Sequence, residues 1–206
     1  MSSIKNIIFD LGGVIFDLDY QRTEDAFVKL GAKDFGVVYS QLKQNPIFDD
    51  FERGTTKTNH FRTDLSELLN INVSDKDFDA AWSALLLGWS KEKLDFAASL
   101  KNDFQIYILS NTNDIHYPIV FDLLKENIGL SSLDSLFEKT YYSNQINMRK
   151  PDREIFELVL DENKLNPTET LFVDDSPQNV QGAIDVGLKG FHVSNDRTVK
   201  DIISIL

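Results

Sequence analysis

Five short apolar runs recur along the chain, each about as long as a β-strand. They cover residues 4–9, 105–109, 140–142, 170–173 and 190–193. Their apolar residues are consecutive rather than alternating, which is typical of strands that are buried on both faces. Such strands occur in parallel sheets that helices cover on each side. The runs therefore predict a parallel sheet of about five strands.

Helical patterns separate the later apolar runs. Apolar residues recur at helical spacing over 115–127, 152–160 and 177–186. Gly129 and Gly187 follow two of these patterns as stop signals, and Ser176-Pro177 is a typical helix start. Strands that alternate with helices of this length predict an α/β fold with a doubly wound, Rossmann-like parallel sheet.

Residues 20–89 follow a different pattern and contain no clear strand. Helical periodicity appears over 23–30, 35–43, 58–69 and 76–87. This stretch is much longer than an ordinary connection between two strands. We therefore expect a helical cap domain, residues 20–89, inserted after strand 1, with residues 1–19 and 90–206 forming the α/β core domain that carries the catalytic site.

Composition narrows the class of protein. The 206 residues are 42% hydrophobic with 15 phenylalanines, which is ample material for a packed core, and they contain no cysteine. A disulfide framework and a thiol nucleophile are thereby excluded. The net charge of −12 argues against nucleic acid or an anionic membrane as partner. Because the N-terminus passes directly into strand 1 and no cysteine is present, we expect a cytoplasmic protein, either a monomer or a weak homodimer.

Polar residues follow four of the predicted strands. Asp10 follows the first run, Ser110-Asn111 the second and Asp174-Asp175 the fourth, while Lys150 opens the helix after the third. Because the carboxyl ends of parallel strands meet at one edge of a sheet, we expect these side chains to converge.

The converging residue types suit a phosphorylated ligand. Clustered carboxylates repel one another and favour a hard cation such as Mg²⁺. Ser110 and Asn111 offer hydroxyl and amide groups to a phosphate, and Lys150 adds a positive charge. Together the metal and the lysine would let a phosphate enter a strongly acidic protein.

Each signal also has an ordinary structural explanation. Asp10 before two glycines can be a plain turn, Ser110-Asn111 a helix cap, and Lys150-Pro151 a helix start with a solvated lysine. The three histidines, His60, His116 and His192, match no metal-binding spacing and are interpreted as structural or solvated. The occurrence of all four polar signals in this order favours a functional site.

In these four motifs the chain resembles the haloacid dehalogenase-like (HAD) hydrolase superfamily. The segment Asp10-Leu11-Gly12-Gly13-Val14 is similar to its first motif, Leu109-Ser110-Asn111 to its second, Lys150-Pro151 to its third and Val173-Asp174-Asp175 to its fourth. The expected cap, inserted after strand 1, is also in a position similar to that of the cap in this superfamily. Phe51-Glu52-Arg53-Gly54 resembles the substrate-facing loop of the bacterial glucose-1-phosphatase-type sugar phosphatases.

The resemblance implies roles for individual residues. Asp10 would attack phosphorus and form an aspartyl-phosphate. Ser110 and Lys150 would hold the phosphoryl oxygens, with Asn111, Glu52 and Arg53 as further substrate-binding residues. Asp10, the Gly12 carbonyl and Asp175 would hold Mg²⁺, and Asp174 would support the metal or pair with Lys150. The expected substrate is a small phosphorylated metabolite such as glucose 1-phosphate.

One position departs from the common pattern of the superfamily. Most of its phosphatases carry a second aspartate two residues after the nucleophile, as general acid and base, and this chain has Gly12 there. A phosphatase with a substitute acid is our preferred interpretation, with Asp17, Asp19 and Glu52 as nearby candidates. A metal-independent 2-haloacid dehalogenase and a catalytically inactive binding module remain alternatives, and a phosphomutase fits least.

Overall fold

A five-stranded parallel sheet forms the centre of the computed structural model, which describes residues 3–33, 35–38 and 46–206. Its strands lie in the order β5-β4-β1-β6-β7, and every neighbouring pair is parallel. The predicted doubly wound parallel sheet is thereby confirmed. The strands are β1 (Asn6–Phe9), β4 (Gln105–Ser110), β5 (Lys139–Tyr142), β6 (Thr170–Asp174) and β7 (Lys189–His192).

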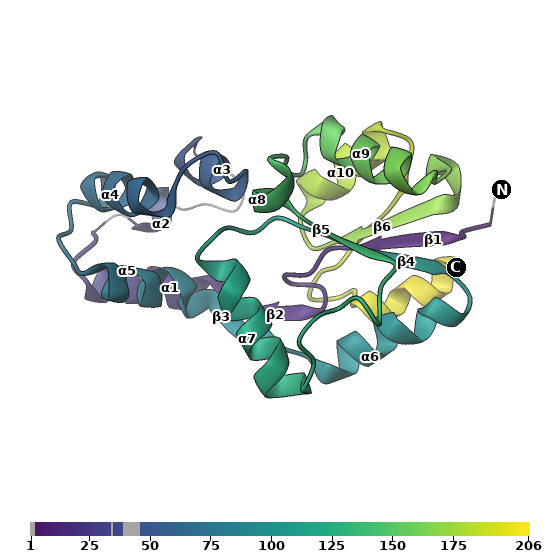
Figure 1. The fold of residues 1–206 in the computed structure, drawn as a ribbon, viewed down its shortest axis with the longest axis horizontal. Helices are drawn as coiled ribbons and strands as arrows, with labels where there is room; N and C mark the ends of the chain where they lie inside the picture. The colour runs from purple at the N-terminus through teal and green to yellow at the C-terminus, as the bar shows by residue number, and fades with distance from the viewer. Residues whose placement is uncertain (1–2, 34, 39–45) are drawn as a thin grey trace.

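Helices cover both faces of this sheet (Figure 1). Ile7 and Phe9 of β1 belong to the apolar cluster that α6, α7 and the C-terminal 3₁₀ helix complete. Ile8 points the opposite way and packs with α9 and α10, as the two-residue repeat of a strand requires. These elements are α6 (Lys91–Ser99), α7 (His116–Ile128), α9 (Arg153–Asn163), α10 (Pro177–Asp185) and the 3₁₀ helix Val199–Ile205.

A second group of helices lies at the end of the molecule opposite the two termini (Figure 1). It comprises α1 (Tyr20–Lys29), α2 (Phe35–Val38), α3 (Pro46–Glu52), α4 (Thr58–Leu69) and α5 (Asp75–Trp82). A separate cluster rich in phenylalanine holds them together, for example Phe51 stacked on Phe61 with ring centroids 3.9 Å apart. We call this group the cap helices. The exact division into core and cap domains stays our interpretation.

The expectation that residues 20–89 contain no strand is wrong. The predicted helix 76–87 ends early, since α5 stops at Trp82 and a 3₁₀ turn, Ser83–Leu85, leads into β3 (Leu86–Trp89). That strand pairs antiparallel with β2 (Phe16–Leu18). A four-residue strand that continues a helical apolar pattern gives too little periodicity to be recognised. The two-stranded ribbon joins the cap helices to the sheet.

Helix boundaries follow the local signals with some exceptions. The predicted helix 58–69 matches α4, and Gly129 ends α7 in the left-handed conformation at φ 85°. Ser176 precedes α10, but its side chain makes no capping hydrogen bond. Of the predicted helix 35–43, residues 35–38 are helical and 39–43 lie outside the described residues. Helices α3, α6 and α8 (Ser143–Ile146) were not predicted.

None of the helices in the described part of the chain combines the length and the apolar character needed to cross a membrane.

Candidate active site

Three carboxylates from distant parts of the sequence meet at the carboxyl edge of the sheet. Asp10 follows the central strand β1, and Asp174 and Asp175 stand at the end of the neighbouring β6. A ligand oxygen from each of the three lies within 4.8 Å of the others. Asp10 is anchored by its own N–H, which donates to the Val173 carbonyl at 2.8 Å. The strand order therefore brings together the acids that the sequence predicted would meet.

Lys150 lies among these carboxylates and is fully enclosed. Its Nζ donates to Asp10 Oδ1 at 2.7 Å and to Asp174 Oδ2 at 2.6 Å, and its exposed fraction is 0%. Burial would lower the pKa of the Lys150 ammonium, but Asp10 and Asp174 more than offset this and raise it. The lysine is therefore charged and fixed beside Asp10, which excludes the alternative of a solvated lysine at a helix start.

The Asp174 carboxylate accepts several hydrogen bonds from other residues of the protein. Besides Lys150, it accepts hydrogen bonds from the Ser176 N–H at 2.8 Å and from the Asn179 side chain at 3.1 and 3.2 Å. These donors use both carboxylate oxygens. The arrangement suits a residue that positions Lys150 better than one that binds a metal directly.

Asp175 lies against the backbone of the loop after β1. Gly13 adopts φ 71°, and a Cβ at this position would lie 2.1 Å from Asp175 Oδ2. Only glycine both accepts this φ readily and leaves room for the carboxylate. Burial, followed by the charge of Asp174, raises the pKa of the Asp175 carboxyl to about 6. Loss of contact with water and a neighbouring negative charge both disfavour the ionised form of this carboxyl.

The cluster fits a divalent cation. Burial raises the pKa of Asp10 well above its ordinary value, and Lys150 only partly opposes that rise. One ammonium does not balance three neighbouring carboxylates, and hard oxygen donors are the ligands that Mg²⁺ prefers. Asp10 and Asp175 are the best placed to hold it. Gly12 lies in the same loop, and the role of its carbonyl as a ligand stays a prediction.

Ser110 ends β4 beside this cluster and Asn111 follows it, and the two side chains differ in how far their polar atoms are already hydrogen-bonded. The Ser110 hydroxyl makes one long contact, 3.4 Å to the Asn111 carbonyl. The Asn111 side chain instead holds the backbone of Lys150, donating to its carbonyl at 2.9 Å and accepting from its N–H at 3.0 Å. Ser110 thus has a hydroxyl to offer an anion, whereas the Asn111 amide is already used to position Lys150.

Glu52 and Arg53, at the end of α3, connect the cap helices to the segment around Lys150. Glu52 Oε2 accepts from Arg149 Nε at 3.0 Å and from Nη2 at 2.7 Å. Arg53 pairs with Asp152. That both residues bind substrate stays a prediction, and of the two Glu52 lines the cavity described below. Arg149 was not singled out from the sequence, where a lone basic residue before Lys150 gives no distinguishing signal.

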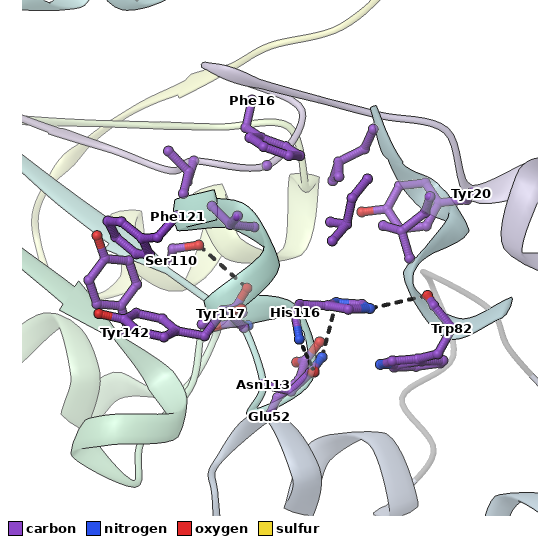
Figure 2. A pocket seen from close by; sticks show the side chains of 18 residues that line it. Phe16, Tyr20, Glu52, Trp82, Ser110, Asn113, His116, Tyr117, Phe121 and Tyr142 are labelled. Carbon is purple, nitrogen blue, oxygen red and sulfur yellow. Dashed lines mark hydrogen bonds between the residues drawn. The ribbon is translucent and has the colours of Figure 1, made fainter. Parts of the chain in front are cut away.

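A cavity of about 100 Å³ lies between the sheet edge and the cap helices. Figure 2 shows Ser110, Glu52, Asn113 and His116 among its lining side chains, and aromatic rings and aliphatic side chains form the remaining walls. His116 Nε2 donates to the Trp82 carbonyl, and Nδ1 accepts from Asn113, both at 3.1 Å. Burial lowers the pKa of His116 to about 4. The structural interpretation of His116 thus agrees with its contacts.

Comparisons with known proteins agree with this geometry. A family model described as haloacid dehalogenase-like hydrolase matches residues 4–187. A D-ribitol-5-phosphate phosphatase of Bacteroides thetaiotaomicron is 30% identical over 203 residues, covering 98% of each protein. A chloroplast flavin mononucleotide hydrolase of Arabidopsis thaliana is 27% identical, covering 92% of this chain and 75% of the relative.

A solved structure is similar over nearly the whole chain. It is a HAD family enzyme from Bacteroides thetaiotaomicron, determined in complex with magnesium and inorganic phosphate. The TM-score is 0.80 at 34% sequence identity, and the alignment covers 93% of this chain and 95% of that protein.

Proposed function

The chain belongs to the haloacid dehalogenase-like hydrolase family, and from this membership we propose that it is a magnesium-dependent phosphatase that acts on a small phosphorylated sugar or polyol. The observation that carries the proposal is the meeting of Asp10, Lys150 and Asp175 at one edge of the sheet. A nucleophile, a cation and a metal-binding carboxylate are the parts that phosphoryl transfer requires.

Each residue has a role in the proposed reaction. Asp10 attacks phosphorus and becomes an aspartyl-phosphate, which water then hydrolyses. Lys150 and the Ser110 hydroxyl hold the phosphoryl oxygens while charge develops on them. Asp174 and Asn111 keep Lys150 in place through its ammonium and its backbone. Bound Mg²⁺, held by Asp10 and Asp175, would neutralise negative charge on the phosphate.

The cavity supports a small substrate. The cavity of about 100 Å³ beside Gly12 and Ser110 can take a compact group next to the phosphate. The relative named as a D-ribitol-5-phosphate phosphatase makes a pentitol phosphate the first compound to test, with glucose 1-phosphate beside it. Arg53 is a further proposed substrate contact, and the cytoplasmic location and the monomer or weak homodimer stay predictions from the sequence.

The proposal is tested with purified protein. Phosphate release from ribitol 5-phosphate, glucose 1-phosphate and p-nitrophenyl phosphate is measured with Mg²⁺ and with EDTA. We expect turnover of at least one of them with Mg²⁺ and none with EDTA, and loss of that turnover in Asp10→Asn. Halide release from 2-haloacids without metal would favour the dehalogenase. Unchanged phosphate release from D10N would contradict the proposed nucleophile.

A further inference from the structure

The structure gives different surroundings to Asp17, Asp19 and Glu52, the three acids considered as substitutes for the missing general acid. Asp17 lies on β2 between Phe16 and Leu18, which both line the cavity. Because side chains alternate along a strand, Asp17 points away from the cavity, and it pairs with Lys93 at 2.6 Å. Asp17 is therefore not placed to reach a bound substrate.

Asp19 has a structural role. Its side chain accepts from the Gln21 N–H at 3.1 Å and so caps α1. It also pairs with Arg22 at 3.4 Å, and its side chain is 42% exposed. Like Asp17, it does not line the cavity.

Glu52 differs from both. Among the described residues that line the cavity, it is the one with a carboxyl group, and Gly12 and Ser110 line the same space. Two buried titratable groups also line it: His116 has both ring nitrogens engaged with protein atoms, and burial raises the pKa of Tyr142, which makes its hydroxyl a weaker acid. Glu52 is thus the carboxylic acid, among the described residues, that shares a cavity with the proposed phosphate site.

The hydrogen bonds of Glu52 leave one oxygen available. Both bonds from Arg149 go to Oε2, and among the described residues Oε1 accepts none. A proton on Oε1 is compatible with this arrangement, because Oε2 still accepts from the guanidinium. Burial raises the pKa of Glu52, while Arg149 opposes the rise. Arg149 would also stabilise the carboxylate that remains once the proton has left.

We propose that Glu52, reaching the site from the cap helices, is the catalytic residue that protonates the leaving oxygen, the task for which Gly12 has no side chain. As Asp10 forms its bond to phosphorus, the bond between phosphorus and the leaving oxygen breaks, and the Oε1 proton of Glu52 passes to that oxygen to give the alcohol. The resulting carboxylate can then take a proton from the water that attacks the aspartyl-phosphate. The inference rests on the proposed phosphatase activity.

Leaving groups of different acidity test the inference. Glu52→Gln is compared with wild type under single-turnover conditions with Mg²⁺, so that only the first chemical step is observed. Ribitol 5-phosphate or glucose 1-phosphate, whichever wild type cleaves, must release an alkoxide and needs the proton, whereas p-nitrophenyl phosphate releases a stable phenolate. For E52Q we expect a loss of about 10²–10⁴ with the sugar or polyol phosphate and of less than about tenfold with p-nitrophenyl phosphate.

Asp49 provides the matched control. It pairs with the same Arg149, Nη1 to Oδ1 at 3.0 Å, but does not line the cavity. Asp49→Asn should therefore leave both rates close to those of wild type. If E52Q folds poorly, Glu52→Asp serves instead, since it keeps an acid but withdraws it by one methylene and should show a smaller loss of the same selective kind.

The outcomes separate the two proposals. Equal losses on both kinds of substrate would show that Glu52 acts through Arg149 or through binding, and no loss on either would show that it has no role in the step. Each result overturns the inference while leaving the phosphatase activity intact. If wild type cleaves none of these phosphates, the proposed function itself is overturned, and this inference with it.

Discussion

Lys150 illustrates how much a single residue contributes to this site. Its ammonium is enclosed between Asp10 and Asp174, so removing it leaves two buried carboxylates without their cation. Breaking a buried pair from one side is far more costly than losing an exposed pair. The sequence could predict that Lys150 would be near Asp10, but not that Asn111 would hold its backbone.

We expect Lys150→Met to lower the free energy of unfolding by about 3–5 kcal/mol in the absence of metal. Urea unfolding at neutral pH measures this change. Lys91 is the matched control, because its pair with Asp95 is exposed and Lys91→Met should change stability by less than about 0.5 kcal/mol. A K150M protein as stable as wild type would mean that the ammonium contributes no net stabilisation to the folded state.

Among the elements, those with a strong and isolated pattern were predicted well from sequence. The inner strands β1, β4 and β6 appear as apolar runs because both of their faces are buried, and α4 has a clean helical repeat over 58–69. The short ribbon of β2 and β3 was missed because each strand spans only three or four residues. Glu52 and Arg149 meet through tertiary packing of α3 against α8, which no local pattern encodes.

The junction between α7 and α5 gives a prediction about pH. Just before α7, the Asn113 side chain accepts from the N–H groups of Ile115 and His116 at 3.1 and 3.0 Å. Its amide group also donates to His116 Nδ1, so a proton on that nitrogen would face another donor. The pKa of His116 is lowered from 6.5 to about 4. Between these values the unfolded chain binds more protons than the folded one, so stability falls as pH falls.

We expect the lowered pKa of His116 to reduce the free energy of unfolding by up to about 3 kcal/mol between pH 7 and about pH 4. Chemical unfolding across this range should show a steeper acid-side decline in wild type than in His116→Gln. The exposed His60 is the control, and His60→Gln should decline as wild type does. Equal declines in wild type and H116Q would contradict a buried neutral histidine.

On the scale of the whole molecule, the site joins the two ends of the sequence inside a strongly acidic protein. Asp10 and Asp175 are brought together by the pairing of β1 with β6, and the net charge of −12 adds to their repulsion. The fold therefore carries an electrostatic strain at this edge that a bound divalent cation would relieve. Binding of a divalent cation should therefore raise the stability of the folded protein, whether or not a substrate is turned over.

Mg²⁺ at about 100 times its dissociation constant should stabilise the fold by about 2.7 kcal/mol, a rise in Tm of about 5–11 °C for a chain of this size. NaCl at matched ionic strength separates specific binding from general screening of the acidic surface. Asp175→Asn should lose most of the Mg²⁺-dependent rise in Tm. Without metal, its Tm should not be lower than that of wild type, because the substitution removes a carboxylate whose pKa is raised to about 6 by burial and by Asp174. Asp161→Asn, an exposed change on α9, should keep the full rise. If D175N kept it too, the stabilising ion would be bound elsewhere, and the meeting of the two chain ends would not be a metal site.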